Sequence, residues 1–168
     1  MMKRYLRRVD REPTGNRNDV TPLFADAEDF SQLVLDLAEP FLHTDIDLVA
    51  CIDALGFILG TALARHLDLG LIPVRKGGKL PVPTEGIDFR DYSGELKRLE
   101  IRKSILSPGS RILLVDEWIE TGSQVMAAAE LIEGQGGIIV GIATINMDKN
   151  EQTSGLSRKH RVHSVWEE

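Results

Sequence analysis

The sequence predicts an α/β fold, a mostly parallel sheet flanked by helices, and two observations support this class. Short apolar runs of strand length alternate with segments of helical periodicity, which is typical of crossovers between parallel strands. With 168 residues, of which 42% are hydrophobic, the chain is long enough to cover both faces of a sheet. We therefore expect a single domain over residues 1–168.

The first half of the chain is expected to form a helix, a strand, a second helix and a second strand. Apolar side chains follow helical spacing over residues 30–41, and residues 47–52 form an apolar run of strand length. Residues 57–67 show a second helical pattern, which Gly70 is expected to end. Residues 71–75 are expected to form the next strand, which implies a right-handed crossover between parallel strands.

The second half opens on a polar segment rich in glycine and proline, residues 76–98. It lacks periodicity, so we predict a long irregular excursion, which in compact domains is usually functional or disordered. Residues 111–115 are then expected to form a buried strand, residues 123–134 a helix and residues 137–145 a further strand.

Charge, cysteine content and hydropathy limit the function classes. A net charge of −6 and an isoelectric point near 5.3 argue against a nucleic-acid partner, which would favour a basic face. Cys51 has apolar neighbours and no second cysteine to pair with, so we expect a buried thiol in a reducing compartment, the cytoplasm. The sequence contains no apolar run of membrane-spanning length, and we expect no membrane partner.

Residues 111–124, RILLVDEWIETGSQ, join a predicted strand to a predicted helix through three carboxylates and a Thr-Gly-Ser turn. In an open parallel sheet, ligands bind at the carboxyl ends of strands, where Asp116 and Glu117 fall. The free amides of the following helix favour an anion such as a phosphate. Ribose 5-phosphate satisfies both halves, because its hydroxyls donate to carboxylates and its phosphate suits the turn. The alternative is a solvated loop whose threonine caps the helix.

Two separate segments resemble the type I phosphoribosyltransferase family. Residues 112–124 resemble the family's phosphoribosyl pyrophosphate signature, and residues 56–81, GFILGTALARHLDLGLIPVRKGGKLP, resemble its adenine-specific members. Weaker similarity covers residues 5–9, 19–30 and 99–111. The resemblance ends near Thr144. It implies the type I phosphoribosyltransferase fold, with a small hood at roughly residues 1–25 and a mobile lid at roughly residues 76–98.

The resemblance also implies roles for individual residues at a phosphoribosyl pyrophosphate site. Asp116 and Glu117 are expected to hold the ribose hydroxyls, and Glu120 is expected to handle a proton of the base. The residues expected around the 5-phosphate are Thr121, Gly122, Ser123 and Gln124. The residues expected around the pyrophosphate are Ala54, Leu55, Arg75, Lys76 and Lys79.

The lid and the hood are expected to supply further contacts. Glu95 matches the loop glutamate of the adenine-specific members and is the second candidate catalytic residue. Arg17 and Asn18 stand where those members have the Phe-Arg pair that frames the base. Mg²⁺ is implied as the cofactor, bound mainly through phosphoribosyl pyrophosphate, with Asp116 as a candidate protein ligand.

Several positions depart from the adenine-specific pattern. Leu55 replaces an arginine, and Ser123 and Gln124 replace the final Gly-Thr of the phosphate loop. Arg17 and Asn18 would suit a 6-oxopurine at least as well as adenine.

The predicted function is that of a purine-type phosphoribosyltransferase, a homodimeric glycosyltransferase of purine salvage. It would transfer 5-phosphoribose from phosphoribosyl pyrophosphate to a nucleobase and release pyrophosphate. The alternative is a non-catalytic regulator that binds phosphoribosyl pyrophosphate or a nucleotide. Trp118 lies inside the ligand loop, where we expect it to pack under the helix; contact with a base or a partner subunit is the other reading.

Overall fold

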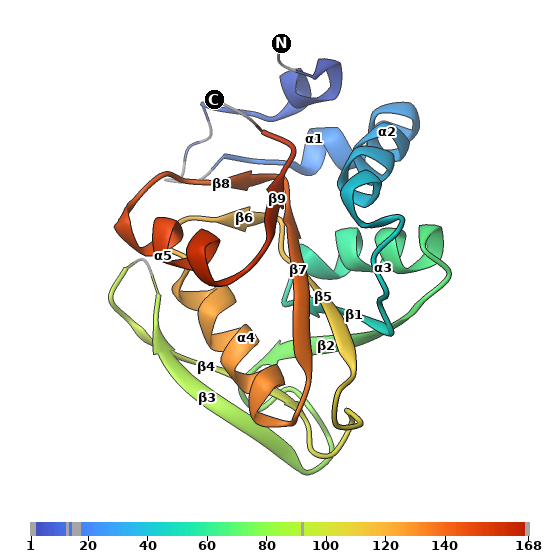
Figure 1. Ribbon diagram of the computed structural model, residues 1–168. Helices are drawn as coiled ribbons and strands as arrows, with labels where there is room; N and C mark the ends of the chain where they lie inside the picture. Colours follow the sequence, from blue (N-terminus) through green and yellow to red (C-terminus); the bar gives the residue numbers. More distant parts are fainter. Residues whose placement is uncertain (1–2, 13, 15–17, 92, 167–168) are drawn as a thin grey trace.

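The computed structural model describes residues 3–12, 14, 18–91 and 93–166 and has an α/β fold (Figure 1). The strands are β1 (Leu48–Ile52), β2 (Gly70–Lys76), β3 (Thr84–Arg90), β4 (Leu96–Arg102), β5 (Arg111–Val115), β6 (Trp118–Ile119), β7 (Ile138–Thr144), β8 (Asn146–Met147) and β9 (Val162–Ser164). The helices are η1 (Arg4–Arg8), α1 (Thr21–Phe24), α2 (Ala27–Ala38), η2 (Glu39–Phe41), α3 (Gly56–His66), α4 (Ser123–Gly134) and α5 (Glu151–Lys159).

Within the described residues, seven strands form one sheet in the order β3-β4-β2-β1-β5-β7-β9. The neighbours from β2 to β9 pair in parallel, whereas β4 pairs antiparallel with both β2 and β3. A separate parallel pair, β6 and β8, lies beyond the end of β5. The mostly parallel sheet expected from the sequence is therefore confirmed.

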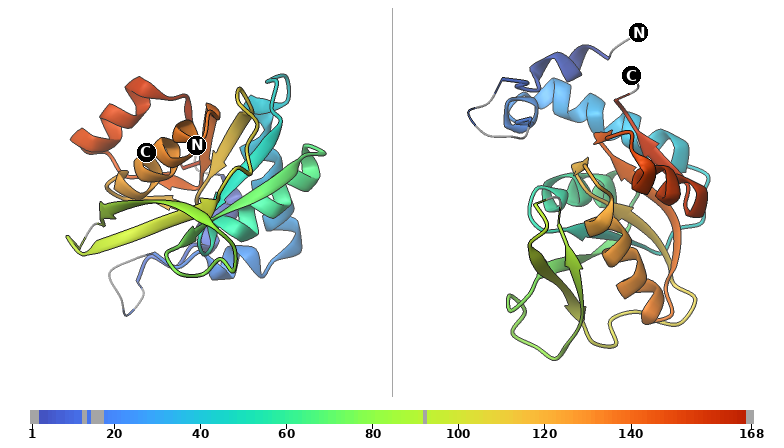
Figure 2. Two further views of the ribbon diagram at one scale, coloured as in Figure 1. Left: turned by 90° about the horizontal axis from the view of Figure 1, so that it is seen from below. Right: turned by 90° about the vertical axis from the view of Figure 1, so that its left-hand side faces the viewer.

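Helices cover both faces of the sheet, with α2 and α3 on one side and α4 and α5 on the other (Figures 1 and 2). Successive strand residues alternate between two buried clusters, because side chains along a strand point to opposite faces. On β1, for example, Val49 belongs to the cluster under α3, and Ala50 to the cluster under α4. Burial on both faces explains why the central strands are continuous apolar runs in the sequence.

Helix α3 crosses β1 at a glycine. A Cβ atom at Gly60 would lie 2.4 Å from the Cβ of Cys51, so a side chain there would force the helix away from the sheet. Cys51 is 1% exposed, and burial together with the nearby Asp116 raises the pKa of the thiol to about 12. The buried thiol expected from the sequence is confirmed, and its raised pKa disfavours the reactive thiolate.

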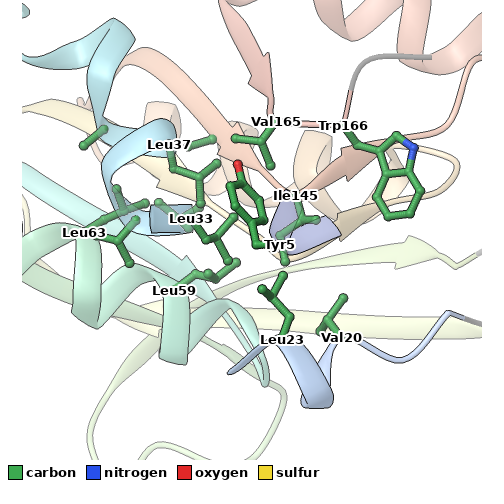
Figure 3. Packing of buried hydrophobic residues seen from close by; sticks show 14 of the residues in the cluster. Tyr5, Val20, Leu23, Leu33, Leu37, Leu59, Leu63, Ile145, Val165 and Trp166 are labelled. Carbon is green, nitrogen blue, oxygen red and sulfur yellow. The ribbon is translucent and has the colours of Figure 1, made fainter. Parts of the chain in front are cut away.

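The N-terminal segment packs onto α2 and against the C-terminal end of the chain. Tyr5 lies in the first cluster with Leu33 and Leu37 of α2, and Val165 and Trp166 pack against the same cluster (Figure 3). The Tyr5 hydroxyl donates to Asp36 at 2.7 Å, so the buried ring also has a polar partner. The two ends of the described chain consequently meet on one side of the molecule (Figure 1).

Residues 76–98 are not the irregular excursion that their composition predicts. They hold all of β3 and the start of β4, which pair over seven residues from Thr84↔Arg102 to Arg90↔Leu96. Every side chain of β3 is at least partly exposed, so the strand lacks the apolar alternation that identifies strands in a sequence. We refer to β3 and β4, residues 84–102, as the hairpin.

One further expectation, the end of the second predicted helix, is corrected. Helix α3 ends at His66, and the left-handed residue after it is Asp68, with φ of 56°, whereas Gly70 already belongs to β2. The residues after Thr144 also form regular structure, because α5 begins at a capping box of Asn150 and Thr153 and leads into β9. No helix in the described part of the chain has the length and apolar character needed to cross a membrane.

Candidate active site

The predicted ligand residues follow three neighbouring strands at the same edge of the sheet. Asp53 to Leu55 follow β1, Arg75 and Lys76 end β2, and Asp116 follows β5. Because β2, β1 and β5 are adjacent and parallel, their carboxyl ends bring these segments together. Two segments that are separated by about sixty residues in the sequence thereby form one site.

The turn after β1 touches the strand end of β5 through Gly56. A Cβ atom at Gly56 would lie 3.0 Å from the carbonyl oxygen of Val115 and 3.3 Å from Oδ1 of Asp116. The start of α3 can approach Asp116 this closely because the position is glycine. The turn expected to bind pyrophosphate therefore lies against the carboxylates expected to bind ribose.

We call residues 116–120 the acid loop, and its first carboxylate is enclosed by the protein itself. Asp116 is 1% exposed; its Oδ1 accepts from the backbone N–H of Glu117 at 2.9 Å, and its Oδ2 accepts from the Gln124 amide at 3.0 Å. Burial, followed by the charge of Glu117, raises the pKa of Asp116 well above its usual range. The side chain thus connects the acid loop to the first turn of α4.

Glu117 is the carboxylate of the pair that faces open space. It is half-buried and lines two adjoining cavities, which also share Asp91 and Gln124. The smaller cavity, of about 50 Å³, is enclosed mainly by the acid loop and residues 121–125. The larger cleft, of about 570 Å³, is lined by Asp53, Ala54, Leu55, Lys76, Gly77, Phe89, Asp91, Leu96, Lys97, Arg98, Glu117 and Gln124.

Residues 121–124, which we call the phosphate loop, turn directly into α4. Gly122 has a φ of 83°, a left-handed conformation that favours glycine, and α4 begins at Ser123. The hydroxyls of Thr121 and Ser123 lie 2.9 Å apart, and the N–H of Ser123 reaches the Thr121 hydroxyl oxygen at 3.3 Å. The amides and hydroxyls at the start of this twelve-residue helix suit an anion.

The cations of the site come from two elements, only one of which the sequence indicated. Lys76 lines the larger cleft as expected, whereas Lys79 is exposed and does not line it. Arg75 donates to Asp53 at 2.9 Å, so this guanidinium orients the turn after β1. The hairpin adds Lys97 and Arg98 to the cleft wall, and no local pattern distinguishes these two residues from ordinary surface cations.

The carboxylate between the two strands of the hairpin that lines the cavities is Asp91, whereas Glu95, the residue expected from the sequence, does not line them; the catalytic role of either residue stays a prediction. Asp91 lines both cavities, and its Oδ1 accepts from the N–H and the hydroxyl of Ser93 at 2.9 and 2.6 Å. Glu95 pairs with Lys97, its side chain is 65% exposed, and it lines neither cavity.

The remaining candidates fall in different places. Glu120 is half-buried and lines the smaller cavity. Trp118 also lines that cavity and packs against the first hydrophobic cluster, in keeping with the packing interpretation; contact with a base or a partner subunit stays a prediction. Asn18 is exposed and lines neither cavity, while Arg17 lies outside the described residues.

Two of the residues that depart from the adenine-specific pattern, Leu55 and Gln124, contact other parts of this protein. Leu55 packs against the first hydrophobic cluster, so the position contributes an apolar contact in place of a charge. Gln124 uses its amide to hold Asp116 and at the same time lines both cavities. Neither replacement leaves an unsatisfied group at the cleft.

Comparison with known proteins agrees with this geometry. Residues 25–164 match the phosphoribosyl transferase domain family, which is most of the chain. The chain belongs to this family. The match continues past Thr144, where the motif resemblance ended, and includes α5 and β9.

Individual members of the phosphoribosyltransferase family are similar over nearly the same span. Adenine phosphoribosyltransferase of Leuconostoc citreum is 39% identical over 135 residues, covering 80% of this chain and 76% of that protein. The enzyme of the same name from Neisseria meningitidis is 44% identical over 128 residues, covering 76% and 68%.

Solved structures of family members confirm the fold. The crystal structure of adenine phosphoribosyltransferase from Rhodothermus marinus superimposes with a TM-score of 0.84 at 33% identity, covering 96% of this chain and 94% of that one. The Saccharomyces cerevisiae enzyme, complexed with an imino-altritol bisphosphate and adenine, gives a TM-score of 0.85 at 26% identity and covers 96% of both chains.

Proposed function

We propose that the protein transfers 5-phosphoribose from phosphoribosyl pyrophosphate to a purine base and releases pyrophosphate. The single observation that supports this most strongly is one cleft shared by the acid loop, the phosphate loop and the turn after β1. A ligand that carries vicinal hydroxyls, a terminal phosphate and a pyrophosphate has a matching group for each of these segments. Membership of the phosphoribosyltransferase family supports the same reaction.

In this proposal Glu117 accepts hydrogen bonds from the ribose hydroxyls, and the phosphate loop holds the 5-phosphate through its amides and hydroxyls. Asp116 contributes by holding Gln124 and the backbone of Glu117 in place. Lys76, with Lys97 and Arg98 of the hairpin, offsets the charge of the departing pyrophosphate. Arg75 acts through Asp53, whose orientation it fixes.

The reaction passes through an oxocarbenium-like state at the anomeric carbon, and water would intercept it in an open cleft. We propose that residues 76–98, which include β3 and the start of β4, are the lid that excludes water and that roughly residues 1–25 form the hood. Limited proteolysis tests the lid: cleavage within residues 76–98 should slow when phosphoribosyl pyrophosphate and magnesium are added. Equal cleavage rates with and without the ligand would refute this role.

The acids that handle the base are proposed to be Glu120 from the acid loop and Asp91 from the hairpin. Both line the smaller cavity, where a ring nitrogen attacking the ribose would be within reach of a proton acceptor. Asp91 takes the part that the sequence alone assigned to Glu95. The named relatives act on adenine, so adenine is the first base to test, while Arg17 and Asn18 keep 6-oxopurines in the comparison.

Mg²⁺ is proposed as the cofactor on the chemistry of the substrate. The described residues contain no group of three or more His, Cys, Asp or Glu side chains that could hold a metal, and both Asp116 oxygens accept hydrogen bonds from the chain. A hard cation would therefore bind mainly to the phosphate oxygens, where it offsets their charge. Glu117 is the protein carboxylate nearest to such a complex in this proposal.

An assay with a panel of nucleobases tests the proposed reaction. The protein is incubated with phosphoribosyl pyrophosphate, magnesium and adenine, hypoxanthine, guanine or xanthine in turn, and pyrophosphate release is measured. We expect release with at least one purine, and none when magnesium is chelated. Binding of phosphoribosyl pyrophosphate without release for any base would instead support the second candidate, a regulator.

Two observations favour the regulator as the second candidate. Asp116 already has both oxygens bonded within the chain, and Leu55 provides no charge to the pyrophosphate turn, so binding could persist with weakened catalysis. The same panel separates the two candidate functions, since a regulator binds the ligand and leaves it intact.

We also propose a homodimer, on the family resemblance alone, and a cytoplasmic location, on the unpaired buried thiol of Cys51. Analytical ultracentrifugation and fractionation test these two statements.

A further inference from the structure

The only two tryptophans of the sequence, Trp118 and Trp166, contact each other beside the acid loop. Their ring centroids lie 5.7 Å apart with an interplanar angle of 67°, the edge-to-face geometry that aromatic pairs prefer. Trp118 is the third residue of the acid loop, whereas Trp166 stands near the end of the chain. The contact therefore joins the site to a residue that lines neither cavity.

A cation from the N-terminal segment completes the stack. The guanidinium carbon of Arg11 lies 4.4 Å from the ring centroid of Trp166, within the range of a cation–π interaction. Trp166 is 8% exposed and its backbone N–H donates to the carbonyl of Ile145 at 2.9 Å, so its position is fixed at the edge of the first hydrophobic cluster (Figure 3). The order of contacts is Arg11, Trp166, Trp118.

The far edge of the Trp118 ring is also held. Its Nε1 donates to Oδ1 of Asp148 at 3.3 Å, and the same oxygen accepts from Asn146 at 2.7 Å. The indole thus sits between Trp166 and the segment after β7. Moving the ring requires losing an aromatic contact, a hydrogen bond, or both.

The backbone of the acid loop depends on the same segment after β7. Ile145 donates to the carbonyl of Glu117 at 3.1 Å, and Asp148 donates to the carbonyl of Ile119 at 2.8 Å. The Asn150 side chain donates to the carbonyl of Glu120 at 2.7 Å. These hydrogen bonds hold the backbone of the acid loop against residues 145–150. Between Glu117 and Glu120, the side chain that anchors the loop is Trp118.

We infer that Trp166 and Arg11 are positioning residues, which act through Trp118 to hold Glu117 and Glu120 in the arrangement that receives the substrate. The inference rests on the proposed function for the identity of that substrate. Without the indole of Trp166, the Trp118 ring can adopt other orientations, and ligand binding must then order the loop at the expense of affinity. Both ends of the chain thereby contribute to a site that neither end lines.

Two readouts test this, and the first needs no ligand. Amide hydrogen exchange of residues 116–123 is measured for the wild type, Trp166→Ala, Trp166→Phe, Arg11→Ala and Arg161→Ala. Arg161 is the matched control, because its guanidinium carbon lies 5.1 Å from the ring centroid of Phe41, a stack of the same kind away from the loop. Calorimetry then gives the affinity for phosphoribosyl pyrophosphate with magnesium.

We expect Trp166→Ala to accelerate exchange of residues 116–123 selectively and to weaken binding about two- to tenfold. Arg11→Ala should weaken binding about two- to fivefold, Trp166→Phe should restore most of the affinity, and Arg161→Ala should leave both readouts at wild-type values. Exchange rates of residues 116–123 in Trp166→Ala that equal those of the wild type would overturn the inference. So would faster exchange spread evenly over the chain, or an equal effect of Arg11→Ala and Arg161→Ala.

Failure of the proposed function has a different signature. A wild-type protein that neither binds nor consumes phosphoribosyl pyrophosphate would refute that function, while the exchange rates of ligand-free protein would still decide whether Trp166 positions the loop. Trp166→Phe and Arg11→Ala keep the test valid if Trp166→Ala does not fold, because each removes less buried surface.

Discussion

The acid loop and the hairpin both bring charged residues to the cleft, but they hold them in different ways. Asp116 of the acid loop is buried and accepts hydrogen bonds from the backbone and from Gln124. Arg98 of the hairpin pairs with Asp88 at 2.9 Å, and the two side chains are 46% and 55% exposed. The acid loop therefore has a carboxyl group fixed by burial and hydrogen bonds, whereas the hairpin has charges paired in solvent.

This difference indicates which part can move at small cost. Exposed ion pairs contribute about 0–1 kcal/mol each, because water screens the charges and competes for the donors. Buried hydrogen bonds to charged groups contribute roughly 1.5–3 kcal/mol, and a partner left unpaired costs more. We therefore expect the acid loop to remain in place while the hairpin adjusts to the ligand.

The largest effect is expected when the acid loop loses its charge. The double variant Asp116→Asn, Glu117→Gln should weaken binding of phosphoribosyl pyrophosphate by at least about 100-fold, because Glu117 loses the charge that strengthens its hydrogen bonds with the ribose hydroxyls and the support that Asp116 gives to Gln124 is weakened. The fold should remain, since the shapes of both side chains are kept. Calorimetry measures the affinity and circular dichroism the fold, with Glu130→Gln on the exposed side of α4 as the control. Affinity equal to that of the wild type would contradict the ribose role.

A second variant tests how closely the turn after β1 must approach the acid loop. Gly56→Ala places a methyl group 3.0 Å from the carbonyl of Val115, which should destabilise the fold by about 1–3 kcal/mol and reduce activity. Gly134→Ala at the end of α4 is the control, because its new methyl group meets no atom within 4 Å. Chemical denaturation measures both. Equal stabilities of the two variants would show that the approach is loose.

A matched pair of hairpin variants tests which carboxylate serves the site. Asp91→Asn should lower kcat by about tenfold or more, as for loss of a proton-handling group, while Glu95→Gln should have little effect. The amide of asparagine can still accept from Ser93, so the turn is expected to persist. Steady-state kinetics with saturating substrates gives the answer. A larger loss from Glu95→Gln would restore the assignment made from the sequence.

The smallest effect concerns stability as a function of pH. The pKa of Asp116 is raised above its ordinary value of 3.8, so the folded state binds more protons than the unfolded state above that pH. Stability contributed by this group is therefore present at low pH and decreases as the pH rises from about 4 toward the folded pKa. Asp116→Asn should be no less stable than the wild type at pH 7, and its relative gain should shrink at pH 4. Melting temperatures at the two pH values measure this; a gain that grows on acidification would refute it.

The candidate site was predictable where local sequence carries a chemical pattern. Asp116, Glu117 and the phosphate loop follow a buried apolar run, so their place at a strand end could be read without a structure. Asp91, Lys97 and Arg98 could not be found this way, because the exposed hairpin has no periodicity and its charges resemble any surface charges. The same cause explains why the sequence directed attention to Glu95, whereas the carboxylate that lines the cavities is Asp91.

The sequence by itself determined the central α/β order, since strands buried on both faces and amphipathic helices leave periodic patterns that local chemistry produces. It also determined the family, because the ligand motifs are continuous in the chain. Only the tertiary structure decided that Asp116 is enclosed by Gln124, that Asp91 faces the cleft, and that Trp166 reaches Trp118. These facts depend on contacts between residues that are distant along the chain or that lack periodic neighbours, and burial and distance are properties of the folded molecule alone.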